Sequence, residues 1–202
     1  MCIAIVVPGG KRLDAAALRR CFDSNRYGAG IAYINRGRVM VAKGFMKADH
    51  LITAYEKLAS KFGDKAMLVH CRIATKGKVG KDNCHPFKFD GGAVVHNGSL
   101  WGGSRADEQS DTSEFVEDNS KFFSKEFIEQ NKDAFERIIG FNRLAFLWPD
   151  GSFTRTLERS WTEHEGIFYS NTTFRDWRSY GGNSSSMYDF GGAACGVGYN
   201  DD

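Results

Sequence analysis

The chain begins MCIAIVV (residues 1–7), a cysteine followed at once by an apolar run that ends at a Pro-Gly-Gly turn. We expect residues 2–7 to form a short strand that is buried on both faces. Removal of Met1 ahead of a residue as small as Cys2 would leave a thiol and a free α-amine on one carbon atom. An α-amine titrates near ~7.7–8.0, so a usable fraction is unprotonated at neutral pH and can accept the thiol proton. Because many proteins carry a small residue here without using it, the rest of the chain decides whether Cys2 is a nucleophile.

The composition is that of one ordinary soluble domain. Of 202 residues, 42% are hydrophobic and 26% are charged, which suffices for a layered core. Lys and Arg number 27 against 25 Asp and Glu, and this near-neutral balance predicts neither nucleic acid nor membrane as a partner. The sequence contains no apolar run of the ~20 residues that span a bilayer, and it does not begin with a signal-peptide pattern. We therefore expect a cytoplasmic protein.

Five cysteines, an odd number without regular spacing, indicate reduced thiols rather than a disulfide framework; they are Cys2, Cys21, Cys71, Cys84 and Cys195. One zinc-like pattern exists, because His70-Cys71 and Cys84-His85 form two mixed pairs. Structural zinc sites usually take each pair from residues two to four apart, and adjacent side chains on a strand point to opposite faces. The spacing therefore disfavours zinc.

Periodicity divides the chain into blocks of strands and blocks of helices. Apolar residues at helical spacing predict helices over residues 13–24, 49–62, 111–123 and 126–139. We expect Asp111 to cap the third helix. Apolar and β-rich runs predict strands over residues 2–7, 30–34, 39–42, 66–73, 92–96, 143–148, 153–157 and 166–170. Because strict strand–helix alternation is missing, antiparallel sheets covered by helices are expected.

Three further segments hold polar groups that a strand-and-turn scaffold does not need. In HCRIATKG (70–77), Arg72 ends an apolar strand; it either pairs with a local carboxylate or clamps the carboxylate of a substrate, a task that suits the guanidinium fork. NCHPF (83–87) is a loop whose proline fixes the backbone. VVHNGS (94–99) ends a strand with Asn-Gly, which is most often a turn, but beside an active site would form an oxyanion hole.

With Cys2 and a further segment, S-D-T at 110–112, these three segments form five ordered motifs: Cys2, H-x-R-x-A-T-x-G at 70–77, N-x-H-P at 83–86, H-N-G at 96–98 and S-D-T. In this order they resemble the N-terminal-nucleophile (Ntn) glutaminase domain of class II glutamine amidotransferases. The resemblance implies an α+β fold: a four-layer αββα Ntn hydrolase sandwich with antiparallel sheets. We expect this domain over residues 1–180, followed by a Gly/Ser-rich tail over residues 181–202.

The resemblance also implies catalytic roles. Cys2 would be the nucleophile, and its own α-amine would be the general base. Asn97 and Gly98 would stabilise the tetrahedral oxyanion. Because the α-amine already fills the acid/base role, we interpret His85 and His96 as structural residues.

Substrate-binding roles follow from the same resemblance. Arg72 would bind the α-carboxylate of glutamine, Asp111 would hold its α-ammonium group, and Thr75 would help to frame the pocket. No metal ion or organic cofactor is required. Two positions depart from the most familiar form of the family, with Ile73 in place of an aromatic residue and Lys76 in place of a frequent histidine. These departures leave the breadth of substrates open.

The reaction expected from this resemblance is hydrolysis of the glutamine side-chain amide to glutamate and ammonia. Because the chain ends at Asp202, we expect a separate synthase to accept the ammonia. Two alternatives stay open: a free-standing hydrolase of another γ-glutamyl amide, and a catalytically idle binding or regulatory domain of the same fold. The joint presence of the five motifs argues against the idle domain.

Overall fold

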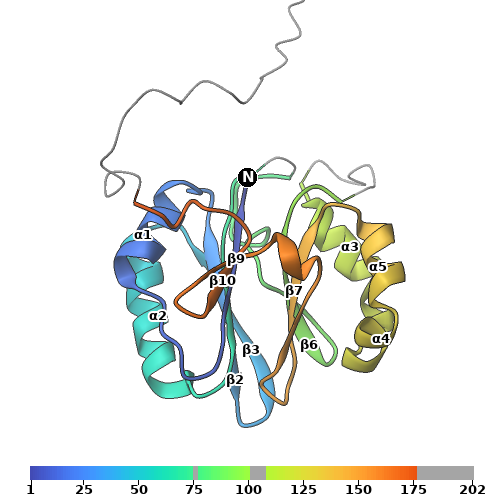
Figure 1. Cartoon of the computed structure of the whole chain (residues 1–202). Coiled ribbons are helices and arrows are strands. Elements are labelled where there is room, and N and C mark those ends of the chain that lie inside the picture. Colours follow the sequence, from blue (N-terminus) through green and yellow to red (C-terminus); the bar gives the residue numbers. More distant parts are fainter. Residues whose placement is uncertain (75–76, 101–107, 177–202) are drawn as a thin grey trace, which may run out of the picture.

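The computed structural model describes residues 1–74, 77–100 and 108–176, which contain two sheets and the helices that cover them (Figure 1). The strands of the first sheet are β1 (Ile3–Val7), β2 (Ala29–Asn35), β3 (Arg38–Phe45), β4 (Met67–Cys71), β9 (Thr162–His164) and β10 (Ile167–Tyr169). Those of the second are β5 (Phe87–Phe89), β6 (Gly92–Asn97), β7 (Arg143–Leu147) and β8 (Phe153–Arg155). The spatial orders are β3-β2-β4-β1-β10-β9 and β5-β6-β7-β8, and every pairing is antiparallel.

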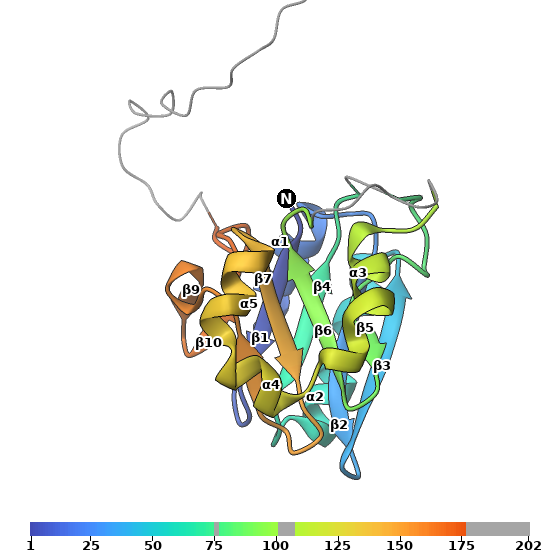
Figure 2. The ribbon, with the colours of Figure 1, turned by 90° about the vertical axis from the view of Figure 1, so that its right-hand side faces the viewer.

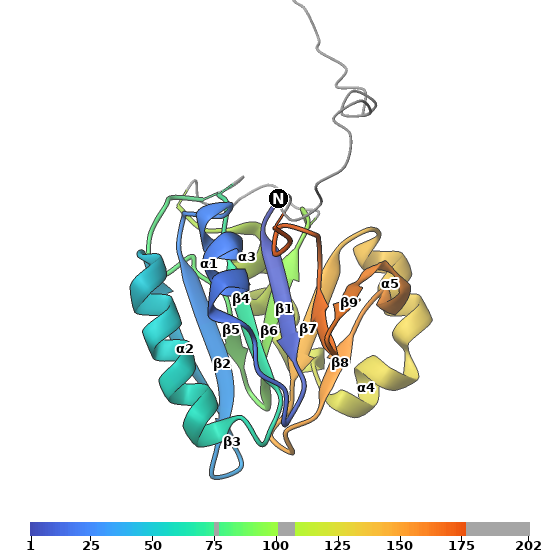
Figure 3. The same cartoon turned by 60° about the vertical axis from the view of Figure 1, so that its left-hand side comes forward.

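The helices form the two outer layers. They are α1 (Ala15–Asp23), α2 (Ala48–Phe62), α3 (Asp111–Asn119), α4 (Lys125–Gln130) and α5 (Lys132–Ile139), with short 3-10 turns at Ser120–Phe122 and Glu158–Ser160. Figure 3 shows α1 and α2 over the first sheet, and Figure 2 shows α3, α4 and α5 over the second. The expected α+β fold, a four-layer αββα sandwich with antiparallel sheets, is confirmed. Within the described residues, no helix combines the length and apolar character needed to cross a bilayer.

Strand β1 lies in the interior because both of its faces are apolar. Ile3, Ile5 and Val7 pack into the core under α1 and α2, whereas Ala4 and Val6 face the core between the two sheets. All five side chains are almost completely buried. An apolar run without polar alternation therefore belongs to a strand with a packed layer on each side.

A third core, under α3, α4 and α5, is built from aromatic rings. The ring of Phe123 lies 5.2 Å from Phe89, 5.4 Å from Phe146 and 6.4 Å from Phe135, edge-on in each case. Such edge-to-face contacts stabilise a core beyond the area that they bury. This cluster fixes the helices of the fourth layer on the second sheet.

The predicted elements are found, with corrections at helix ends. Ser110, not Asp111, caps α3, because its side chain accepts a hydrogen bond from the backbone N–H of Ser113 at 3.2 Å. The helix expected over 126–139 is two helices, broken at Asn131. Strands β5 and β9, three residues each, were not predicted, because such short runs carry too little periodicity. The expected tail over 181–202, and with it the end of the predicted domain at 180, lies outside the described residues.

Candidate active site

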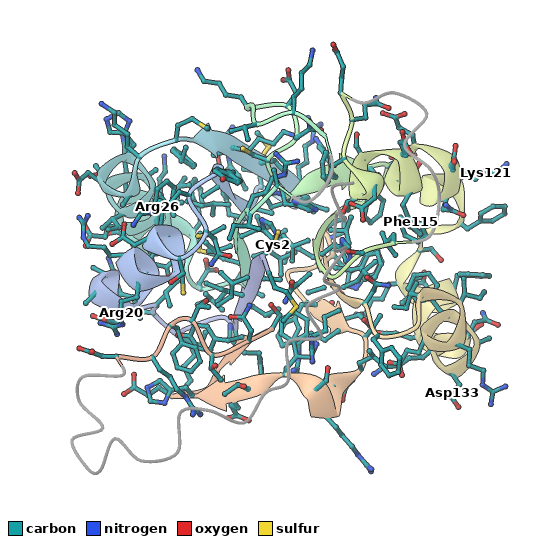
Figure 4. All side chains as sticks on the ribbon, turned by 90° about the horizontal axis from the view of Figure 1, so that it is seen from above. Cys2, Arg20, Arg26, Phe115, Lys121 and Asp133 are labelled. Atoms are coloured by element: carbon teal, nitrogen blue, oxygen red, sulfur yellow. The ribbon has the colours of Figure 1, made fainter. Side chains whose placement is uncertain are left out.

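The antiparallel register of the first sheet places Cys2 beside Arg72. In the β1–β4 pair Ile3 lies opposite Cys71, so the residue before β1 meets the residues that follow β4. The Cys2 Sγ accepts a hydrogen bond from the Ile73 N–H at 3.3 Å and lies 3.2 Å from the Ile73 carbonyl oxygen. The amino terminus lies at this end of the sandwich, between the two sheets (Figure 1), and the view from above places Cys2 near the centre of that end (Figure 4).

The Cys2 thiol is partly buried, and its surroundings have opposing effects on its pKa. Burial raises the pKa of the thiol, whereas the Ile73 N–H, the amino terminus and the Arg72 guanidinium lower it; the net pKa is raised, and Asp111 adds to the rise. The same balance places Arg72 and Asp111 within electrostatic reach of the sulfur. A thiol with a raised pKa needs a base before it can attack a carbonyl.

Arg72 is held by backbone contacts at its site. It is 2% exposed, and its guanidinium donates a hydrogen bond to the Lys78 carbonyl at 3.0 Å. Asn83 joins the same loop to the next one: its side-chain amide donates to the Lys78 carbonyl at 3.0 Å and to the Glu108 carbonyl at 2.6 Å, and its side-chain oxygen accepts from the Ser110 N–H at 3.0 Å. Asn83 of the N-x-H-P motif therefore connects the loop at Lys78 to the loop at Glu108 and Ser110, and both loops flank the site. Thr75, the other predicted binding residue of this loop, lies outside the described residues.

Asp111 is the first residue of α3, and its carboxylate is oriented by backbone N–H groups. One oxygen accepts from the Leu100 N–H at 2.9 Å and the other from the Thr112 N–H at 2.8 Å. The second oxygen also lies 3.3 Å from the Thr112 hydroxyl, whereas the oxygen that accepts from Leu100 keeps a lone pair for a cationic group. A carboxylate fixed in this way, near Cys2, suits the binding of an ammonium ion.

Asn97 ends β6 and Gly98 follows it, at the same end of the second sheet. The Asn97 side-chain amide donates to the Ser170 hydroxyl at 3.0 Å, and its buried oxygen has no hydrogen-bond partner among the described residues. Gly98 adopts a φ of +149°, and a Cβ there would lie 2.1 Å from Oδ1 of Asn142. The left-handed conformation and the close contact both require glycine at this position.

His96 fixes the end of β6 by two side-chain contacts. Its Nε2 lies 2.8 Å from Oδ1 of Asn142, and its Nδ1 lies 2.7 Å from the hydroxyl of Thr112. Because the Asn142 amide group donates to the Ile139 carbonyl, its oxygen faces His96, so Nε2 donates and Nδ1 accepts. Burial lowers the pKa of His96, in keeping with this neutral form. The predicted structural interpretation of His96 agrees with these contacts.

His85 is also an interior residue. Its ring packs 4.1 Å from that of His70 and 4.7 Å from that of Phe87, and neither of its nitrogens has a partner among the described residues. Nε2 of His70 lies 2.9 Å from the carbonyl oxygen of His96, a contact that joins the two sheets. The described residues contain no group of three or more His, Cys, Asp or Glu side chains that could hold a metal ion. The two mixed His/Cys pairs therefore do not assemble a zinc site.

A pocket of about 790 Å³ opens beside Cys2. Its walls include Asn97, Gly98 and, between the end of α5 and the start of β7, residues 137, 138 and 140–143. Met1, which is attached to the Cys2 nitrogen, also borders it. Arg72 and Asp111 are not among the residues that line it, so they approach Cys2 from another direction.

Three residues at this site were not predicted: Asn142, Ser170 and Asn171. The Ser170 hydroxyl accepts from the Ala4 N–H at 2.9 Å as well as from Asn97, and the Asn171 amide donates to the Cys2 carbonyl at 2.7 Å. Ser170 and Asn171 follow the apolar strand β10, much as Asn97 and Gly98 stand at the end of β6. That pattern of polar residues after a buried strand was the available signal.

Comparisons with known proteins find a relative in sequence and similar solved structures, while no protein-family model matches the chain. The chain is 35% identical over 96 residues to glutamine–fructose-6-phosphate aminotransferase (isomerizing) from Acinetobacter baylyi. The aligned region covers 48% of this chain and 14% of that protein. It matches the structure of glutamine phosphoribosylpyrophosphate amidotransferase from B. subtilis with a TM-score of 0.53 and 18% identity, over 84% of this chain and 41% of that one. The chain thus spans less than half the length of either relative. Both matches agree with the resemblance of the motifs, which is thereby confirmed, and the structural match shows that the chain has the Ntn fold of that amidotransferase.

Proposed function

We propose that the chain hydrolyses the side-chain amide of glutamine, with Cys2 as the nucleophile after removal of Met1. The observation that carries the proposal is the meeting of separate motifs around one sulfur atom. Ile73 donates to the Cys2 sulfur, and Arg72 and Asp111 lie within its electrostatic reach. Asn97 and Gly98 share a pocket wall with Cys2.

The amino-acid end of glutamine binds between two opposite charges in this proposal. The Arg72 guanidinium receives the α-carboxylate, because its planar fork matches a carboxylate. The Asp111 carboxylate receives the α-ammonium group. With the α-carbon held there, the γ-amide extends toward Cys2.

The first chemical step forms a thioester. The α-amine of Cys2 takes the thiol proton, the sulfur attacks Cδ, and the C–S bond forms as the amide oxygen becomes an oxyanion. The Asn97 amide and the Gly98 N–H stabilise that charge. The C–N bond then breaks, and the α-ammonium group returns the proton to the nitrogen, which leaves as ammonia.

Water completes the reaction. It loses a proton to the α-amine and adds to the thioester carbon; the C–S bond breaks, glutamate is released, and the α-ammonium group returns the proton to the sulfur. No redox partner is needed, because every bond change is a nucleophilic substitution. A separate cytoplasmic enzyme would accept the ammonia. The dedicated hydrogen bonds of Asn97, Asp111 and Asn83 favour this enzymatic function over an idle domain of the same fold.

A glutaminase assay combined with intact-mass measurement tests the proposal. We expect glutamate and ammonia in equal amounts from protein whose mass lacks Met1. Protein that is fully active with Met1 retained would contradict the mechanism, because the Cys2 nitrogen would then be an amide without basicity.

A further inference from the structure

We propose that the pocket beside Cys2 binds the leaving group of the substrate, and that this leaving group is an amino acid with an apolar side chain. The substrate class would then be γ-glutamyl amino acids and short γ-glutamyl peptides, which share the γ-glutamyl amide group of glutamine but carry a larger leaving group. This inference rests on the proposed function, since it takes Cys2 as the nucleophile.

The position of Met1 defines which side of the nucleophile the pocket occupies. Met1 is bonded to the Cys2 nitrogen and borders the pocket, so the α-amine of the processed protein would face the same space. That amine must protonate the departing nitrogen. Arg72 and Asp111, which would hold the other end of the substrate, do not line the pocket. The leaving group therefore departs into it.

The size of the pocket exceeds what glutamine requires. Its volume is about 790 Å³, whereas a water-sized leaving group such as ammonia fills only ~30 Å³. Volumes of ~300–1,000 Å³ are typical of sites that bind whole small molecules. Removal of Met1 would widen the pocket further, because this residue forms part of its wall.

The charges that line the pocket favour an anion. Arg137 and Arg143 border it, and none of the described residues that line it is Asp or Glu. The Arg143 Nε donates to Ser160, at 2.8 Å to the hydroxyl and 3.2 Å to the carbonyl, which fixes the guanidinium. Its two terminal NH₂ groups have no partner among the described residues. These donors can receive the α-carboxylate of a leaving amino acid.

Apolar side chains at the rim supply the second part of the recognition. Phe141 is 96% exposed and Ile138 is 72% exposed, and both border the same pocket. Two large apolar side chains exposed at the rim of one pocket form an apolar surface that suits contact with a ligand. An apolar side chain on the leaving amino acid would cover them while its carboxylate meets the arginines.

The chemistry is that of the proposed function with a substituted nitrogen. Sulfur attacks the γ-carbonyl carbon, the C–N bond breaks, and the proton held by the α-amine passes to the leaving nitrogen, so a free amino acid departs in place of ammonia. Hydrolysis of the thioester follows with water as the only co-reactant.

Three substrates test the inference on the full chain: glutamine, γ-glutamyl-phenylalanine and γ-glutamyl-phenethylamide, which lacks only the leaving carboxylate. We expect kcat/KM to be highest for γ-glutamyl-phenylalanine, and loss of the carboxylate to lower it about 10- to 100-fold. Arg143→Met should abolish the difference between the last two substrates. Phe141→Ala should lower kcat/KM for both phenyl substrates more than for glutamine.

Exposed residues elsewhere provide matched controls. Arg36→Met, in the β2–β3 turn, and Phe122→Ala, in the 3-10 turn after α3, should change none of the three rates. Hydrolysis of glutamine with no preference for γ-glutamyl-phenylalanine, or equal effects of the pocket variants on every substrate, would overturn the inference and leave the proposed function standing. Failure to hydrolyse any of the three substrates would overturn both.

Discussion

The two sides of Cys2 are built differently. On one side Arg72 is 2% exposed and Asp111 accepts two backbone hydrogen bonds, so both groups are fixed before a ligand arrives. On the other side the pocket wall carries Phe141, which is 96% exposed, and Arg137, which is also exposed. A charged pair that is fixed in advance favours one particular group of the substrate, whereas an open pocket wall can contact leaving groups of different size and shape. The contrast indicates strict selection of the γ-glutamyl group and a broader choice of leaving group.

The nucleophile joins the two sides, and its loss should have the largest effect. Cys2→Ser should lower kcat for every substrate on the order of 10³-fold or more, because a hydroxyl is far less acidic than a thiol. Circular dichroism should show an unchanged fold, since Ser is nearly isosteric. Turnover close to that of the unaltered protein would exclude Cys2 as the nucleophile.

The oxyanion donors at the boundary of the two sides come next. Asn97→Ala should lower kcat about 10²- to 10³-fold with a smaller change in KM. Gly98→Ala should lower kcat and stability together, because the new methyl group would lie 2.1 Å from Asn142 Oδ1 at a φ of +149°.

Gly10→Ala is the matched control for backbone strain. Gly10 also has a positive φ, of +78°, but a Cβ there meets nothing within 4 Å. This variant should lose stability through the backbone alone and keep its kcat. If the two glycine variants behave alike in kinetics, Gly98 has no role at the oxyanion.

The side of Cys2 that carries Arg72 and Asp111 can be tested by changing the shape of the positive group while keeping its charge. Arg72→Lys should raise KM about 10- to 100-fold for all γ-glutamyl substrates alike, because an ammonium group cannot form the paired hydrogen bonds of a guanidinium. Arg36→Lys, at an exposed turn, should leave KM unchanged. Steady-state kinetics with glutamine and γ-glutamyl-phenylalanine would detect the difference; an effect on only one substrate would place Arg72 on the leaving-group side.

The smallest effect concerns the histidines beneath the site. Burial lowers the pKa of His70 to about 3 and that of His85 well below its usual value. The unfolded chain therefore binds more protons below pH ~6.5 than the folded protein does, so stability is complete above that pH and falls as the pH drops toward 3. Urea unfolding between pH 7 and pH 4.5 should show this slope.

Removal of one buried histidine should make the unfolding free energy depend less steeply on pH. His85→Phe should reduce the pH dependence of the unfolding free energy by up to about 1.4 kcal/mol per pH unit in that window. His50→Phe, at an exposed position of α2, is the control and should leave the slope unchanged. An unaltered slope in the His85 variant would mean that this ring is protonated in the folded protein.

Much of the fold could be predicted because its long elements carry clear patterns. The apolar run Ile3–Val7 and the amphipathic helix Ala48–Phe62 are found within one or two residues of their predicted bounds. Strand Phe87–Phe89 is too short to carry a period, and the break at Asn131 depends on local hydrogen bonds that no apolar pattern records.

The candidate site divides in the same way. Motif order predicted Cys2, Arg72 and Asn97 without any knowledge of how the strands pair. Ser170 contacts Asn97 across 73 residues of chain, and Asn142 contacts His96 across 46 residues. No local sequence pattern contains contacts of this kind. The roles assigned to the motif residues stay predictions until kinetics test them.

Covalent trapping of the nucleophile tests the central claim most directly. The diazoketone analogue of glutamine should alkylate Cys2, and peptide mapping by mass spectrometry should find the label on an amino-terminal peptide that lacks Met1. Cys21, Cys71 and Cys84 are buried, so they should stay unlabelled, and excess glutamine should slow the reaction. Label spread over other cysteines, or label on Cys2 that glutamine does not slow, would contradict the account.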